Sequence, residues 1–76
     1  MRGMSVDSFH VQCSGRRSHP HPTTDVTPKE RNGRWVYNCP VCCYDQSVAA
    51  VPERFSGTVM DIHEMACRIT AGEFPR

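Results

Sequence analysis

Cysteine and histidine are the residues of this sequence whose types and spacing could support chemistry. Cys39 and Cys42 enclose Pro40 and Val41, the spacing at which a tight turn directs two thiolates towards one metal ion. Proline inside the turn also stiffens it. Redox dithiols share this spacing, but they need a thioredoxin-like alternation of strands and helices, for which 76 residues leave no room. The pair therefore predicts half of a structural zinc site.

Three pairings could complete the site, because a structural zinc ion takes four ligands. The first joins Cys13 with a histidine of the His-Pro-His segment 19–21. The second joins Cys13 with His10, again with two residues between the ligands. The third joins His63 with Cys67, which lie one helical turn apart.

Strand periodicity favours the first pairing. In the predicted strand 6–13, His10 and Cys13 lie on opposite faces. A second predicted strand, 34–39, ends at Cys39, so a sheet of the two strands brings both cysteines to one end. The loop that follows Cys13 then returns over that end and offers an imidazole.

Either histidine of that loop could be the fourth ligand, and His19 is preferred over His21. His19 is nearer to Cys13 in the sequence and ends the Gly-Arg-rich loop. Cys43 follows directly after the metal-binding turn and is interpreted as a spare thiol pointing away from the ion. The expected cofactor is therefore Zn²⁺. Its predicted ligands are Cys13, His19, Cys39 and Cys42.

Residues 58–71 have the apolar spacing of an amphipathic helix. Thr58 is the expected N-cap, and Gly72 is expected to close the other end. The predicted apolar stripe consists of Val59, Ile62, Ala66 and Ile69, with Met65 at its edge. His63 and Cys67 flank this stripe and are interpreted as boundary residues, with zinc ligation as the alternative.

The hydrophobic core that these elements can build is thin. The chain has no leucine, and its isoleucine, valine and phenylalanine residues total 13. A chain of this length buries only roughly 60% of its unfolded surface. Such a domain usually needs an additional cross-link, or staple, such as a disulfide or a structural metal ion. The five cysteines are odd in number, and the first ten residues lack the apolar middle of a signal peptide, which argues against a disulfide scaffold. We expect one metal-stapled α+β domain over residues 1–76.

Two segments of this domain are expected to be irregular. Residues 1–5 are interpreted as a disordered N-terminus, and residues 20–32, rich in proline and threonine, as an extended loop. No apolar run approaches the roughly 20 residues of a membrane helix, so no membrane contact is expected.

The order of the motifs resembles a known protein family. The string CSGRRSHP at 13–20, the strand GRWV at 33–36 running into the Cys39–Cys42 pair, and the C-terminal helix are similar to the small uncharacterised zinc-ribbon proteins of actinobacterial phages and prophages. The resemblance spans residues 9–71. It implies a zinc-ribbon hairpin or sheet followed by a C-terminal α-helix, a phage origin and a location in the host cytoplasm. The implied ligands are Cys13, a histidine at 19 or 21, Cys39 and Cys42. The second His-Pro, Cys43 and a helix without leucine depart from the pattern.

An enzyme is not expected. The string HEMAC at 63–67 is similar to the His-Glu-x-x-His motif of metalloproteases, with cysteine in the last place. A catalytic zinc also needs an open coordination position and a substrate cleft. The sequence shows neither a nucleophile paired with a base nor a Gly-rich phosphate loop, and no small-molecule substrate is predicted.

The distribution of charge supports two non-enzymatic hypotheses. Residues 1–38 carry a net charge of +3 and residues 39–76 a net charge of −2, which gives a dipolar surface suited to steering a partner. The leading hypothesis is a zinc-binding adaptor for a host or phage protein, such as a transcription or defence component. The alternative is a nucleic-acid-binding module, in which basic residues hold phosphates beside aromatic rings. Its candidate residues are Arg16, Arg17, Lys29, Arg31 and Arg34.

Overall fold

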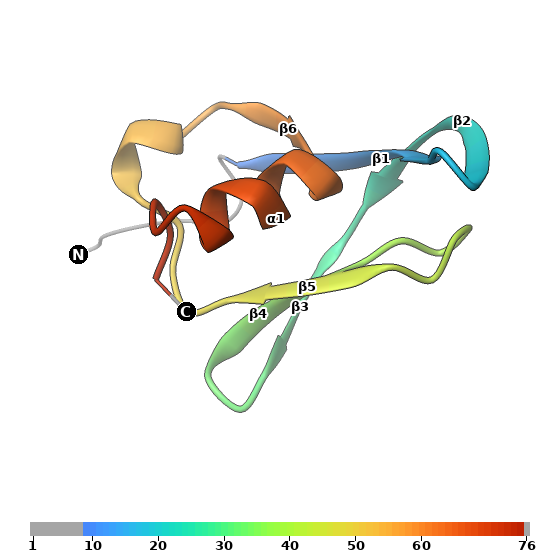
Figure 1. Cartoon of the computed structure of the whole chain (residues 1–76). Helices are drawn as coiled ribbons and strands as arrows, with labels where there is room; N and C mark the ends of the chain where they lie inside the picture. Colours follow the sequence, from blue (N-terminus) through green and yellow to red (C-terminus); the bar gives the residue numbers. More distant parts are fainter. Residues whose placement is uncertain (1–8, 76) are drawn as a thin grey trace.

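The computed structural model describes residues 9–75 and arranges them as two three-stranded sheets and one α-helix (Figure 1). The first sheet has the order β2-β1-β6 and contains β1 (His10–Arg16), β2 (His19–Val26) and β6 (Val59–Asp61). The second has the order β3-β4-β5 and contains β3 (Pro28–Arg31), β4 (Arg34–Asn38) and β5 (Asp45–Val48). The 3-10 helix η2 (Glu53–Phe55) and helix α1 (Ile62–Thr70) follow. The expected small α+β domain with a C-terminal helix is confirmed. The prediction for residues 1–5 lies outside the described residues.

The β1–β2 hairpin contains an irregularity that depends on a glycine. The two strands are antiparallel, but their register shifts between Cys13, which pairs with Thr24, and Gly15, which pairs with Pro20. Gly15 has a φ of +88°, and a Cβ atom there would lie 2.6 Å from the carbonyl oxygen of His19. Only glycine accommodates both this φ and this close approach. The bulge therefore brings the two strands together next to Cys13.

The loop predicted over residues 20–32 is wrong, because most of this segment is strand. β2 continues through its prolines to Val26, and β3 begins at Pro28 after the single residue Thr27. Both strands lie at the edge of their sheet, where a proline removes no ladder hydrogen bond if its nitrogen faces outwards. The segment therefore runs from the first sheet directly into the second.

The second sheet is built on a tight turn between β3 and β4. Asn32 and Gly33 occupy it with φ angles of 54° and 78°, the left-handed values that favour an Asn-Gly hairpin turn. The turn sets β4 so that Tyr37 is fully buried and Trp35, two residues earlier, is partly buried and packs against the core. β4 ends directly before Cys39, so the same register places that thiol in the interior.

The core joins both sheets with α1, which contacts β1, β5 and β6. Aromatic rings supply much of the volume that leucine would otherwise fill. The ring of Phe9 meets those of Tyr37, Phe55 and Phe74 edge-on, with centroids 6.0–6.3 Å apart. Phe55 and Phe74 stack at 4.8 Å. The other buried apolar side chains are Val11, Val26, Val48, Val51, Met60, Ile62, Met65 and Ile69.

Helix α1 begins four residues later than predicted. Residues 59–61 instead form β6, which pairs in parallel with β1, and Asp61 rather than Thr58 is the N-cap. The Asp61 carboxylate accepts a hydrogen bond of 2.9 Å from the backbone N–H of His63. Val59 is accordingly a strand residue with 57% exposure and not part of the helical stripe. Gly72, at a φ of +87°, lies just past the helix end as expected. No helix among residues 9–75 is long and apolar enough to span a membrane.

Candidate metal centre

Three thiols and one imidazole meet between the β1–β2 hairpin and the loop that follows β4. They belong to Cys13, His21, Cys39 and Cys42, here called the Cys3His group, and their sulfur and nitrogen atoms all lie within 4.8 Å of one another. Cys13 Sγ lies 3.6 Å from Cys42 Sγ and 3.5 Å from His21 Nε2. Cys39 Sγ lies 3.6 Å from His21 Nε2. The thiols are buried and the imidazole is half-buried.

The imidazole of His21 is held in the orientation that a metal ligand requires. Its Nδ1 lies 2.8 Å from the carbonyl oxygen of Pro22, which assigns the proton to Nδ1 because a carbonyl can only accept. Nε2 is then unprotonated and points towards the thiols of Cys13 and Cys39. A backbone carbonyl on the second ring nitrogen is the usual device that fixes the tautomer of a metal-binding histidine.

The turn from Cys39 to Cys42 has the hydrogen bonds of a metal-binding knuckle. The N–H of Cys42 donates to the sulfur of Cys39 at 3.4 Å, and the N–H of Cys43 donates to the carbonyl of Cys39 at 3.0 Å. Cys43 itself has a φ of 60° and an exposed side chain, so its thiol lies outside the Cys3His group as predicted. In β1, the N–H of Gly15 donates to the sulfur of Cys13 at 3.4 Å. The N–H groups of Cys42 and Gly15, which donate to sulfur, are suited to stabilising thiolates.

The fourth member of the group is His21, so the preference for His19 is wrong. The register of the β1–β2 hairpin explains the difference. Cys13 pairs with Thr24, whereas His19 pairs with Arg16 beside the hairpin turn. In an antiparallel hairpin, the residue further along the returning strand lies nearer to the start of the first strand. His21 therefore reaches Cys13, and His19 is exposed at the end of the hairpin.

The interatomic distances fit a zinc ion. Zinc bonds of about 2.3 Å to sulfur and about 2.0–2.1 Å to nitrogen give a tetrahedron with S–S edges of about 3.8 Å and S–N edges of about 3.6 Å. The S–S distance between Cys13 and Cys42 is 3.6 Å, and the two S–N distances to His21 are 3.5 and 3.6 Å. Three thiols and one imidazole are also a donor set that zinc prefers. The group could therefore hold a zinc ion.

Burial makes the thiols dependent on a nearby positive charge. Burial is the largest cause that raises the pKa of Cys13, the neighbouring thiols of Cys39 and Cys42 add to the rise, and together they bring this pKa to about 12. A hydrogen bond with the backbone of Tyr44 lowers the pKa of Cys42. Three clustered thiols cannot all ionise in an apolar interior without a cation, and a divalent metal ion is the usual one.

His63 and Cys67, which sequence reasoning considered as a pair, have different surroundings. The Nε2 atom of His63 lies 3.6 Å from the sulfur of Cys13, and its ring lies 4.5 Å from that of Tyr44. Cys67 is exposed, and neither residue belongs to the Cys3His group. No local pattern indicates the position of Tyr44, because its contact with His63 joins the loop after β4 to the first turn of α1.

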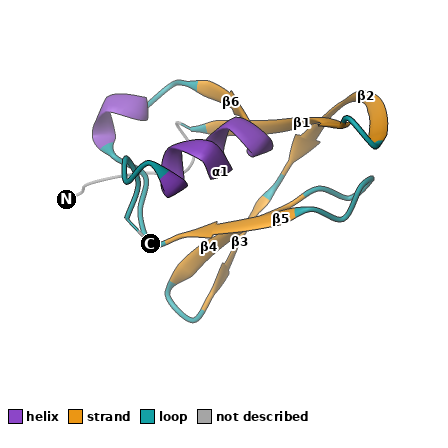
Figure 2. Ribbon diagram, in the orientation of Figure 1, coloured by secondary structure: helices purple, strands orange, loops and turns teal. Residues whose placement is uncertain are grey.

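The five basic residues proposed for nucleic-acid binding do not form one surface. Figure 2 shows the β1–β2 turn and the β3–β4 turn at opposite ends of the molecule. Arg16 and Arg17 lie at the first turn, and Lys29, Arg31 and Arg34 lie around the second. The Arg16 guanidinium also packs over the Tyr44 ring, 5.9 Å from its centroid. The five basic side chains therefore do not line one continuous phosphate-binding surface.

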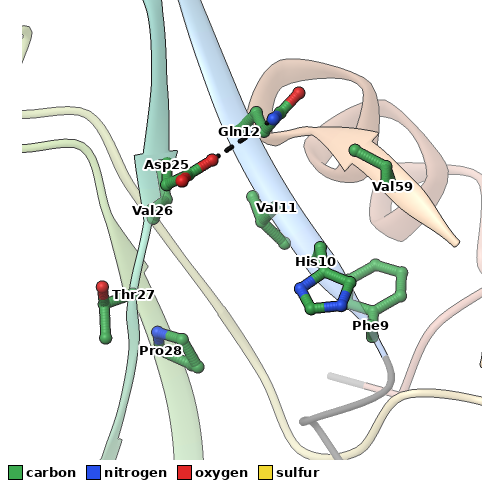
Figure 3. A pocket seen from close by; sticks show the side chains of 9 residues that line it. All are labelled: Phe9, His10, Val11, Gln12, Asp25, Val26, Thr27, Pro28 and Val59. Carbon is green, nitrogen blue, oxygen red and sulfur yellow. Dashed lines mark hydrogen bonds between the residues drawn. The ribbon is translucent and has the colours of Figure 1, made fainter. Parts of the chain in front are cut away.

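The molecule also has a surface pocket of about 410 Å³ (Figure 3). It is lined by residues of β1 and β2, the β2–β3 connection and Val59. Two of its polar side chains bind each other, because the amide of Gln12 donates to the carboxylate of Asp25 at 3.2 Å. The pocket shares no lining residue with the candidate metal centre.

Comparison with known proteins identifies no relative of this chain. The chain matches no protein-family model, no curated protein and no solved structure. The similarity to phage zinc-ribbon proteins, with the origin and location that it implies, therefore stays a prediction. The interpretation of the site depends on the geometry of the Cys3His group.

Proposed function

We propose that the chain is a structural zinc domain in which Cys13, His21, Cys39 and Cys42 hold one Zn²⁺ ion. The observation that carries this proposal is the agreement of the S–S distance of 3.6 Å and the S–N distances of 3.5 and 3.6 Å with the edges of a zinc tetrahedron. The proton on His21 Nδ1 supports it, because this tautomer offers Nε2 to a metal.

The zinc ion in this proposal has a structural role. Four protein donors fill a tetrahedron and leave no position for a substrate or for an activated water. The three sulfur donors are buried, which further separates the ion from solvent. A closed site of this kind supports a non-enzymatic function.

The position of the site explains why a thin core suffices in this proposal. Cys13 and His21 come from the first sheet, whereas Cys39 and Cys42 follow the central strand of the second. One ion would therefore cross-link the two sheets at the end of the molecule. Structural zinc binding contributes about 10–16 kcal/mol in small finger peptides, and this binding energy is also folding energy.

We further propose that the domain is an adaptor that binds a protein of a phage or of its host, in the host cytoplasm. The feature that supports protein binding is β6, an edge strand that pairs on one side only among residues 9–75 and carries an exposed apolar residue, Val59. Exposed strand edges recruit extended segments of partner proteins through main-chain hydrogen bonds. The nucleic-acid alternative has less support, because its basic residues are divided between the β1–β2 turn and the β3–β4 turn, which lie far apart in Figure 2.

The zinc proposal is tested by metal analysis and metal removal. We expect one zinc per chain in protein purified with zinc, and loss of its circular dichroism signal when a chelator removes the metal at neutral pH. Re-addition of zinc should restore the signal. Unchanged circular dichroism after complete metal removal would contradict a structural role for the ion.

The adaptor proposal is tested with an edge-strand variant. Val59→Asp places a charge on the exposed apolar position of β6, and Thr70→Asp, at an exposed position of α1, is the matched control. A stoichiometric protein partner should be captured by the wild type and by Thr70→Asp but not by Val59→Asp. Tight binding of random DNA or RNA at low salt, weakening steeply as salt is raised, would favour the alternative instead.

A further inference from the structure

His63 lies against the Cys3His group without belonging to it. Its Nε2 atom lies 3.6 Å from the sulfur of Cys13, a distance suited to an N–H···S hydrogen bond. His21, and not His63, is the imidazole whose nitrogen lies within 4.8 Å of all three sulfurs in the group. His63 thus contacts one thiol from outside the set of four donors.

The surrounding contacts hold His63 in this position. Its ring packs on the ring of Tyr44 with centroids 4.5 Å apart, and its backbone N–H donates to the N-cap Asp61 at 2.9 Å. The same carboxylate accepts a bond of 3.1 Å from the backbone N–H of Ser14, the residue after Cys13. The start of α1 therefore contacts β1 at two points, the backbone N–H of Ser14 and the sulfur of Cys13.

We propose that His63 is a positioning residue of the metal centre, whose Nε2–H donates a hydrogen bond to the Cys13 thiolate. This inference depends on the proposed zinc site. A metal-bound thiolate keeps lone pairs that accept hydrogen bonds, and the N–H of Gly15, 3.4 Å from the same sulfur, provides one donor. His63 provides the second, from a different element of the fold.

This role has consequences that a packing role alone does not have. Hydrogen bonds withdraw electron density from a thiolate, so Cys13 should react more slowly with electrophiles. They also stabilise the thiolate against protonation, which competes with metal binding, so the metal should be released more slowly. The proton must be on Nε2, which is the opposite tautomer from that of His21. The two imidazoles beside Cys13 therefore have different functions, one as ligand and one as hydrogen-bond donor.

The test compares two substitutions at His63 in the zinc-loaded chain. His63→Phe keeps an aromatic ring against Tyr44 but has no donor, whereas the terminal amide of His63→Gln can replace Nε2–H. We expect His63→Phe to weaken zinc binding about 10-fold or more in competition with a chelator, and to increase the rate of thiol alkylation. His63→Gln should restore both values towards the wild type. His10→Gln, at an exposed position of β1, is the control and should have no effect.

Cobalt substitution distinguishes a donor from a ligand. His63→Phe should keep the tetrahedral three-sulfur, one-nitrogen spectrum with a shifted sulfur-to-cobalt charge-transfer band. A spectrum that has lost a nitrogen ligand would make His63 a ligand and overturn the proposal. Zinc affinity and spectrum equal to the wild type in His63→Phe would also overturn it, as would a His63→Gln variant no better than His63→Phe.

A measurement on the wild type makes the test independent of the folding of the variants. In the zinc-loaded chain, ¹⁵N NMR of the imidazoles should show His63 protonated at Nε2 and His21 protonated at Nδ1. An unprotonated Nε2 on His63 would contradict the proposal directly. If the wild type binds no zinc at all, the proposed zinc site itself fails, and this outcome is distinct from each of the others.

Discussion

His21 Nε2 lies 3.5 Å from Cys13 Sγ, whereas His19, which is nearer to Cys13 in the sequence, pairs with Arg16 at the hairpin turn. The two histidines are separated by one proline, and their rings lie 6.2 Å apart. Only the register of the β1–β2 hairpin distinguishes them. The pair therefore offers a sharp test of the metal centre, because two similar substitutions should have opposite outcomes.

Replacement of His21 should remove the metal, and replacement of His19 should not. We expect His21→Ala to weaken zinc binding by more than about 100-fold, since a lost ligand should exceed the 10- to 100-fold effect of an outer-shell partner. His19→Ala should bind zinc as the wild type does. Both affinities can be measured by competition with a chromophoric chelator. The reverse order of effects would show that the solution register differs from that described.

The five cysteines should separate into two classes. Serine at Cys13, Cys39 or Cys42 should reduce bound zinc well below one ion per chain, because each removes a buried sulfur donor. Serine at Cys43 or Cys67, both exposed, should leave the zinc content unchanged. Metal analysis of the five purified variants checks this prediction. Loss of zinc in Cys67→Ser would instead support the pairing of His63 with Cys67.

Tyr37 should make the zinc-loaded protein sensitive to alkaline pH. Burial raises the pKa of its phenol from 10.0 to about 12. The fold thus favours the protonated phenol, so this contribution to stability is complete below pH 10 and is lost as the pH rises towards 12. In urea unfolding at a series of pH values, the free energy of unfolding should fall more steeply over this range for the wild type than for Tyr37→Phe.

The same substitution should be tolerated at neutral pH. The Tyr37 hydroxyl is buried and has no hydrogen-bond partner among residues 9–75. An unpaired buried polar group costs about 1–3 kcal/mol, so Tyr37→Phe should be at least as stable as the wild type at pH 7. A clear loss of stability would indicate that the hydroxyl has a partner in solution, such as an ordered water.

Gly15 should be more sensitive to substitution than Gly33. Alanine at either position adopts an unfavourable left-handed φ, which costs about 1–2 kcal/mol. A Cβ atom on Gly15 would also lie 2.6 Å from the carbonyl oxygen of His19, whereas one on Gly33 meets nothing within 4 Å. Gly15→Ala should therefore weaken zinc binding as well as stability, and Gly33→Ala should reduce stability alone. Thermal unfolding and chelator competition measure the two effects, and equal zinc affinities would contradict the role given to the bulge.

Local signals predicted much of the fold and three members of the site. The spacing of Cys39 and Cys42 involves neighbouring residues, so the sequence alone reveals it. The alternation along β1 also placed His10 and Cys13 on opposite faces, and the structure exposes His10 and buries Cys13. Each of these predictions depends on a period or a spacing that tertiary contacts do not change.

The errors arose where pairing between distant segments decides the structure. Thr58 has the chemistry of an N-cap, but its carbonyl accepts from the N–H of His10 at 2.9 Å, and the following residues join β1 as β6. The prolines of β2 indicated a loop because the sequence does not show which strand lies at a sheet edge. The contact between His63 and Cys13 joins residues 50 positions apart and has no local signal.

The division of the four donors between two hairpin regions has a consequence for the order of folding. Cys13 and His21 are eight positions apart and Cys39 and Cys42 only three, so each pair is brought together by closing a short loop. The contact between Cys13 and Cys42 spans 29 positions and has a larger closure entropy. We therefore expect each half-site to form early and independently, with docking of the two halves as the slow step. Metal concentration should consequently change the refolding rate as well as the final stability.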